Sequence, residues 1–205
     1  MTTTPPIIPT PRRRWLQFSL RGLFIGILVL SLPLGWFAYK LRQAREHRTA
    51  VKAIQTLGGR VGCYPDRLGR LSGEEVRGDR LWVRLSRTPV RDAGLVYLRG
   101  LTTLYQLDLD ATKVTDAGLV HLKGLTQLKV LSLDSTQITD AGLGHLRGLT
   151  QLQVLYLGNT QVTDAGLEHL QRLTQLGELY LASTRVTDPG VAELQKALPK
   201  VTIHR

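Results

Sequence analysis

The sequence predicts an α/β solenoid of parallel strands and short helices, preceded by a single transmembrane helix and a helical linker. Three observations support this fold class. From Val90 onward the chain realigns with itself at a fixed period, which makes near-copies of residues 90–113, 114–137, 138–161 and 162–185. Residues 22–39 contain no charged side chain. Residues 1–60 hold ten basic residues and one acid, so most of the net charge of +11 lies there and the repetitive body is nearly neutral.

The N-terminal segment is predicted to hold a membrane anchor. Residues 1–14 are proline-rich and basic, which is typical of a disordered tail. Residues 15–39 follow, and a spanning helix needs about 20 mostly apolar residues. Trp15, Trp36 and Tyr39 lie near the ends of this segment, as interfacial aromatics do. A cleaved signal peptide is disfavoured because bulky aromatics stand where small cleavage-site residues belong. A buried core helix is disfavoured because basic residues flank both ends.

The charge flanking this segment bears on membrane orientation. Arg12, Arg13, Arg14 and Arg21 precede or enter it, and four basic residues follow within residues 40–48. The positive-inside rule is therefore nearly balanced. Because the leading arginines are denser, we expect a single-pass protein whose repeat domain is exported rather than cytoplasmic.

Two segments connect the anchor to the repeats. Residues 40–59 are predicted to form a helical linker that ends at Gly58–Gly59. Its apolar stripe packs on the body or, as the alternative, pairs with a second copy; the stripe contains Leu41, Ala44, Val51, Ile54 and Leu57. Residues 60–79 are predicted to be an N-terminal cap, because the first leucine layer of a solenoid must be covered. The covering side chains would be Val61, Tyr64, Leu68 and Leu71.

Residues 80–205 form the predicted solenoid. Residues 114–137 read VTDAGLVHLKGLTQLKVLSLDSTQ, and the other units are close copies. The alternation at Leu131 and Leu133 predicts a short strand. The next unit starts with Thr139-Asp140, where Asp140 is predicted to cap a helix that Gly148 ends. A shortened last unit, 186–205, is predicted to end in an edge strand near residues 198–203.

This pattern resembles the leucine-rich-repeat family, and the resemblance covers about residues 80–205. The family's Asn or Cys position is occupied by threonine, at Thr88, Thr112, Thr136, Thr160 and Thr184. The resemblance implies that these side chains bond the backbone of adjacent coils in a ladder. The T-D-A-G-L phrasing is similar to repeats of F-box adaptors. The whole architecture resembles bacterial membrane-anchored leucine-rich-repeat proteins.

Motifs of catalysis and cofactor binding are absent from the sequence, so neither an enzyme nor a cofactor is expected. Cys63 is the single cysteine and is expected to be a small buried residue. His121, His145 and His169 recur once per repeat and predict a histidine column on the convex, helical side. Repeat identity explains this column better than a metal site does.

The candidate binding residues flank the strand leucines and vary between repeats. They would lie on the concave face, which solenoids use for binding. The predicted partner-binding residues are Trp82, Arg84, Asp108, Asp110, Ser132, Asp134, Tyr156, Glu178 and Tyr180, with Ser86, Gln106, Val130, Val154, Gly158 and Ala182 beside them. A solvated sheet face without a partner is the alternative.

The function expected from these features is a non-catalytic, membrane-anchored module that binds a protein partner on the concave face. The alternative is an adaptor that recruits a partner on the cytoplasmic side, as F-box-type repeat proteins do. Lipid would be contacted through the anchor, and self-association would use the linker helix. Nucleic acid is disfavoured as a partner because the basic residues flank an apolar span.

Overall fold

A computed structural model describes residues 47–64 and 80–205. These residues all belong to one compact unit, Gln43–Arg205. The predicted tail (1–14), the predicted anchor (15–39), the start of the linker and residues 65–79 of the predicted cap lie outside the described residues. Within the described ranges, no helix has the length and apolar character needed to cross a membrane.

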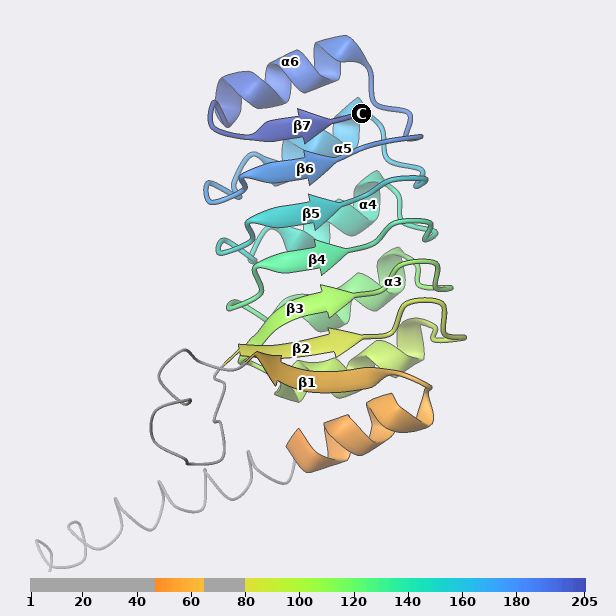
Figure 1. Cartoon of the computed structure of the whole chain (residues 1–205). Coiled ribbons are helices and arrows are strands. Elements are labelled where there is room, and N and C mark those ends of the chain that lie inside the picture. The colour runs from red at the N-terminus through yellow and green to blue at the C-terminus, as the bar shows by residue number, and fades with distance from the viewer. Residues whose placement is uncertain (1–46, 65–79) are drawn as a thin grey trace, which may run out of the picture. The chain divides into compact units, whose positions relative to one another are not determined.

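The described residues form one seven-stranded sheet whose strand order follows the chain (Figure 1). Only β1 is antiparallel to its neighbour, and the pairs from β2 to β7 are parallel, one strand per repeat. The strands are β1 (Arg60–Tyr64), β2 (Arg80–Arg84), β3 (Leu104–Asp108), β4 (Val130–Ser132), β5 (Val154–Tyr156), β6 (Glu178–Tyr180) and β7 (Thr202–His204). The last strand confirms the predicted C-terminal edge strand.

Short helices lie behind the sheet and return the chain to the start of the next strand (Figure 1). Most repeats use a short α-helix followed by a 3₁₀ turn, which agrees with the short helices predicted for the solenoid. The helices are η1 (Asp92–Gly100), α3 (Asp116–Leu119), η2 (Val120–Leu122), α4 (Asp140–Leu143), η3 (Gly144–Leu146), α5 (Asp164–Leu167), η4 (Glu168–Leu170) and α6 (Asp188–Ala197).

The leucines of the repeats form one continuous core between the sheet and the helices. In the central coils Leu128, Leu131 and Leu133 are fully buried, so one coil alone could not shield them. Before the first coil, residues 47–56 are helical. Ala50 and Ile54 of that helix lie in the core and Leu57 packs against it, so Ile54 and Leu57 of the predicted stripe face the body. Leu41 and Ala44 of that stripe lie outside the described residues.

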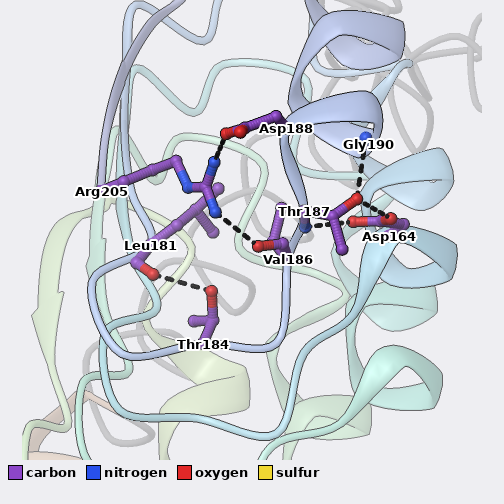
Figure 2. A network of polar contacts seen from close by, with 8 residues as sticks. All are labelled: Asp164, Leu181, Thr184, Val186, Thr187, Asp188, Gly190 and Arg205. Atoms are coloured by element: carbon purple, nitrogen blue, oxygen red, sulfur yellow. Dashed lines mark hydrogen bonds and ion pairs between the residues drawn. The ribbon is translucent and has the colours of Figure 1, made fainter.

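The repeated aspartates join neighbouring coils, which corrects the prediction that Asp140 caps its own helix. The N-cap residue is Thr139, whose backbone is extended. Asp140 Oδ1 accepts the Thr163 N–H at 2.8 Å and Oδ2 accepts the Thr163 hydroxyl at 2.7 Å. The same bridge links Asp92 to Thr115, Asp116 to Thr139 and Asp164 to Thr187, the last drawn in Figure 2. We call each such pair a rung.

The physical reason for this correction lies in the extended backbone of the threonine. An N-cap residue needs a non-helical backbone, and threonine provides it. The aspartate is the first helical residue, so its carboxylate turns toward the next coil. There an extended threonine presents a backbone N–H and a hydroxyl together, and both suit one carboxylate.

The glycine two residues after the first helical aspartate makes room for the rung; the sequence is D-A-G at Gly118, Gly142 and Gly166 and D-P-G at Gly190. A Cβ atom at Gly118 would lie 2.6 Å from Asp92 Oδ1, which is closer than real contacts allow. Gly142, Gly166 and Gly190 meet Asp116, Asp140 and Asp164 in the same way. This glycine is therefore required by the carboxylate of the preceding coil.

The threonines at the family's Asn or Cys position act within one coil, which corrects the ladder implied by the resemblance. The hydroxyl of Thr136 donates to the Leu133 carbonyl at 2.5 Å, and that of Thr160 donates to Leu157 at 2.6 Å. A single short hydroxyl reaches only this nearby carbonyl. The residue before each threonine is left-handed, as Ser135 is with φ 55°, so the hydroxyl closes a tight turn after the strand.

Candidate protein-interaction face

The parallel register arranges the outward side chains of the sheet in two rows. These rows flank the buried central row that includes Leu107, Leu131 and Leu155. One row contains Trp82, Gln106, Val130, Val154, Glu178 and Thr202; the other contains Arg84, Asp108, Ser132, Tyr156, Tyr180 and His204. Because the sheet is in register, equivalent side chains of consecutive repeats become neighbours.

A small groove opens at the first strands of this face, between β2 and β3. Trp82, Arg84, Gln106 and Asp108 line it. Arg84 Nε lies 3.2 Å from Asp108 Oδ2, and its guanidinium carbon lies 5.9 Å from the centre of the Trp82 ring. The Arg84 side chain is still 56% exposed. It is thus positioned by two neighbours while leaving donors available to a partner.

Three carboxylates stand beside this groove, near the ends of β3 and β4. Asp108 Oδ1 accepts the Asp110 N–H at 3.1 Å, and Asp134 Oδ1 accepts the Gly158 N–H at 2.6 Å. Burial raises the pKa of Asp134, and the charges of Asp110 and Asp108 raise it further, against the opposing effect of the Gly158 hydrogen bond. The negative charge gathered here is therefore only partly compensated.

A stack of three rings occupies the last strands of the face. The Tyr156 and Tyr180 rings lie 4.4 Å apart and 13° from parallel. The Tyr180 and His204 rings lie 4.3 Å apart and 10° from parallel. The Tyr180 hydroxyl donates to Glu178 Oε2 at 2.8 Å, a bond that raises the pKa of Tyr180 to about 12. The phenol is therefore neutral at any physiological pH.

His204 was not among the residues proposed from the sequence for this face. It follows Tyr180 by the same interval that separates Tyr180 from Tyr156, so the repeat period could have identified it. The shortened last repeat hid this signal. The structure thus extends the aromatic stack by one strand.

The structure brings most of the proposed residues into two groups. Trp82, Arg84 and Asp108 surround the groove. Tyr156, Glu178 and Tyr180 meet at the ring stack. Ser132 separates the groups, in register with Asp108 on one side and Tyr156 on the other. Asp110 and Asp134 lie just beyond the ends of their strands.

Two other sequence predictions concern residues outside this face. Cys63 is exposed, which contradicts its predicted burial. The reason is that β1 is the outer strand of the sheet. It pairs with β2 on one side only, where Cys63 is in register with Leu81. His121, His145 and His169 lie in the helical layer, and within residues 47–64 and 80–205 no group of three or more metal-ligating side chains comes together.

Comparison with known proteins identifies the class of the repeats. Residues 102–162 and 126–186 match the leucine rich repeat family. Together with the parallel register of β3 to β6, this match identifies residues 102–186 as leucine-rich repeats with an α/β arrangement. Such repeats suggest a protein-interaction module.

Two solved structures are similar to part of the chain. An internalin from Listeria monocytogenes is 26% identical, with 53% of this chain and 36% of the internalin covered and a TM-score of 0.38. A leucine-rich-repeat protein from Leptospira interrogans is also 26% identical, with 54% and 27% covered and a TM-score of 0.43. The chain thus spans about a third of the first and a quarter of the second. A comparison with curated proteins found no match.

Proposed function

We propose that this chain is a non-catalytic interaction module, held at a membrane by residues 15–39, that binds a protein partner on the concave side of its sheet. The observation that carries the proposal is the ring stack of Tyr156, Tyr180 and His204, on the face that the leucine core leaves uncovered. Partly exposed aromatic rings held rigidly beside charges are the usual anchors of protein interfaces.

The size of the face defines the kind of contact. Six parallel strands about 4.8 Å apart give a surface roughly 24 Å long from Trp82 to His204. The groove at Arg84 and the ring stack at Tyr180 lie toward its two ends. This length accommodates an extended peptide or one edge of a small domain. Such a contact is modest in area, and avidity on a membrane would strengthen it.

The test removes the two tyrosines together, as Tyr156→Ala with Tyr180→Ala in the full chain. Proximity labelling around the native protein supplies the partner set, and recovery of those partners is then compared between variants. We expect at least a tenfold loss of recovery, since an interface anchor contributes about 2 kcal/mol or more. Unchanged recovery would remove the tyrosines from the interface.

A matched control is available in the turns between strand and helix. Gln137→Ala with Gln161→Ala changes two exposed residues that also follow each other by one repeat. Neither side chain belongs to the two rows of the sheet face. Recovery of partners should be unaffected, and thermal unfolding of both double variants verifies that the fold persists.

The membrane part of the proposal rests on the charge-free residues 22–39 and their interfacial aromatics. We expect the chain to stay with the membrane pellet after carbonate extraction. Recovery of a soluble chain that starts after Tyr39 would instead reveal a cleaved signal peptide. Protease added to spheroplasts tests orientation: we expect digestion of the repeat domain, and protection would place it in the cytoplasm.

A further inference from the structure

A patch of apolar and basic side chains covers the helical side of the first coils, away from the sheet face. Val96, Tyr97 and Val120 are 40%, 44% and 36% exposed. They are the large apolar side chains that stand exposed in the described part of the chain. Arg99, Lys123 and Arg147 are exposed beside them on the same helical layer. These six residues are called the convex patch.

The helical packing places these side chains in columns. η1 packs on η2 and η2 packs on η3, so equivalent residues of consecutive repeats lie in adjacent coils. Val96 precedes Val120 in one column. Arg99, Lys123 and Arg147 follow one another in a second column. The two columns therefore run side by side across the first two coils, and the basic column continues into the third, where Gly144 takes the valine position.

The fourth coil has polar side chains in place of these valine and basic residues. Glu168 occupies the position of Val96 and Val120, and Gln171 occupies that of Arg99, Lys123 and Arg147. Both residues are exposed on the same fold. Since polar residues are accepted at these positions, the fold itself does not demand valine or lysine there. The apolar and basic character is a property of the coils that come first in the chain.

No described carboxylate forms an ion pair with the basic side chains of the convex patch. Asp92 and Asp116 of the same helical layer keep their charge but are bonded to threonines in rungs. Arg99 and Lys123 form no ion pair with another described residue. Arg147 faces His169 Nδ1 at 2.5 Å, which is not a carboxylate contact. Three basic groups are thus available to an anionic surface.

We propose that the convex patch is a lipid-contact surface that docks the repeat domain on an anionic membrane. Exposed Tyr and Val beside Arg and Lys are the composition of interfacial membrane contacts. Anionic headgroups attract each such basic residue with about 1 kcal/mol. An acidic protein would use the charges but leaves three exposed apolar side chains unexplained.

The inference rests on the proposed function in one respect, because the proposed anchor keeps the repeat domain near the bilayer. Residues 40–46 separate the predicted end of the span from the first described residue, and eight chain steps extend at most about 28 Å. The patch lies on η1, η2 and η3, which belong to the first three repeats of the chain. A tethered domain therefore meets the bilayer at high local concentration, and a weak contact is sufficient.

The experiment reads the depth of a label on the patch in the full chain. Gly124→Cys places a thiol next to Lys123, where an added Cβ meets nothing within 4 Å. In a Cys63→Ser background it is labelled with a fluorophore and reconstituted into vesicles that carry quencher-labelled lipid. We expect strong quenching in vesicles of phosphatidylcholine and phosphatidylserine, and weak quenching in phosphatidylcholine alone. A label at Gln137→Cys, outside the patch, should stay unquenched in both.

The variants substitute residues of the convex patch with the residues found at the equivalent positions of the fourth coil. Lys123→Gln should weaken docking about fivefold, the equivalent of one basic residue. Val120→Glu with Lys123→Gln should abolish quenching. The matched control is Lys113→Gln, an exposed lysine outside the patch whose equivalents are Gln137 and Gln161. This control loses the same charge and should dock normally.

Co-flotation and quenching together distinguish failure of the patch from failure of the anchor. Co-flotation of the chain with vesicles but no quenching at position 124 overturns the patch and leaves the anchor standing. Failure to co-float overturns both. Quenching that does not depend on the phosphatidylserine content overturns docking on an anionic membrane. Quenching that disappears in the Val120→Glu, Lys123→Gln variant and persists in Lys113→Gln supports it.

Discussion

At the scale of the residue, repeated side chains gain different roles from small differences in their neighbours. Asp134 and Asp140 are both aspartates near the end or start of a coil. Asp140 accepts two hydrogen bonds from Thr163, whereas Asp134 accepts one from Gly158 and faces two further carboxylates. The first arrangement holds coils together. The second leaves a carboxylate that is more easily protonated.

The raised pKa of Asp134 makes a prediction about pH. A folded state that binds the proton more tightly than the unfolded state loses relative stability as pH rises through that pKa. Asp134→Asn removes the charge while its amide oxygen still accepts the Gly158 N–H. We expect a higher melting temperature than wild type at pH 7, and a difference that vanishes near about pH 3.5, where carboxylates become protonated.

Thermal unfolding monitored by circular dichroism gives the melting temperatures of Asp134→Asn and wild type at pH 7 and at about pH 3.5. Glu168→Gln serves as the control, because it neutralises an exposed carboxylate in the helical layer. It should change the melting temperature less than Asp134→Asn does. A lower melting temperature for Asp134→Asn at pH 7 would contradict the assigned cost of the charge.

At the scale of the element, the helices are too short to be stable by themselves. The helices α3, α4 and α5 close only one turn each, and isolated helices need about 12 residues or more. Their stability comes from buried leucines and from the rungs that tie each helix start to the next coil. The rung thus stabilises helices that are too short to be stable on their own.

The close contact between this glycine and the rung predicts that an added methyl group lowers the stability of the fold strongly. In Gly142→Ala the new Cβ collides with the Asp116 carboxylate, which must then release Thr139. Two charge-assisted hydrogen bonds are weakened, and we expect a loss of about 2–4 kcal/mol in the free energy of unfolding. Urea denaturation measures it.

Gly124→Ala is the matched control for this substitution. Its added Cβ meets open space, so stability should change by less than about 0.5 kcal/mol. If the two alanine variants unfold at the same urea concentration, the rung does not constrain this glycine.

The elements themselves were largely predictable from the sequence, because apolar spacing alone defines strand and helix within each repeat unit. Residues that act across coils were less predictable. A local reading assigns Asp140 to its own helix, since nothing in one repeat reveals that the threonine of the next repeat will bind it. The position of Cys63 depends on which strand is outermost, and His204 was obscured by the shortened final repeat.

At the scale of the whole molecule, stability is the sum of nearly identical interfaces between coils. β3, β4, β5 and β6 pair at equivalent positions, with Leu107, Leu131, Leu155 and Leu179 in one row. No long-range contact closes the solenoid in the described part of the chain, since the sheet order follows the sequence. The number of coils is therefore adjustable in principle.

This modularity predicts that a chain lacking residues 138–161 still folds. The deletion removes one complete period, and Gln137 then leads directly into Val162. Asp116 meets Thr163 in place of Thr139, so the rung is rebuilt. We expect cooperative unfolding at a lower melting temperature and an unchanged shape of the far-ultraviolet circular dichroism spectrum. A deletion of residues 138–155 breaks the period and should not fold.

The rungs also give the solenoid a direction. Four coils receive a carboxylate from the coil before them, at Thr115, Thr139, Thr163 and Thr187. Asp188 occupies the same position as those carboxylates in its own coil. Figure 2 shows that Arg205 takes the place of a threonine there, with one guanidinium nitrogen on Asp188 and the other 2.8 Å from the Val186 carbonyl. Within the described residues, Asp188 thus binds a guanidinium, whereas Asp92, Asp116, Asp140 and Asp164 each bind a threonine. The same carboxylate position is therefore satisfied by two different kinds of side chain.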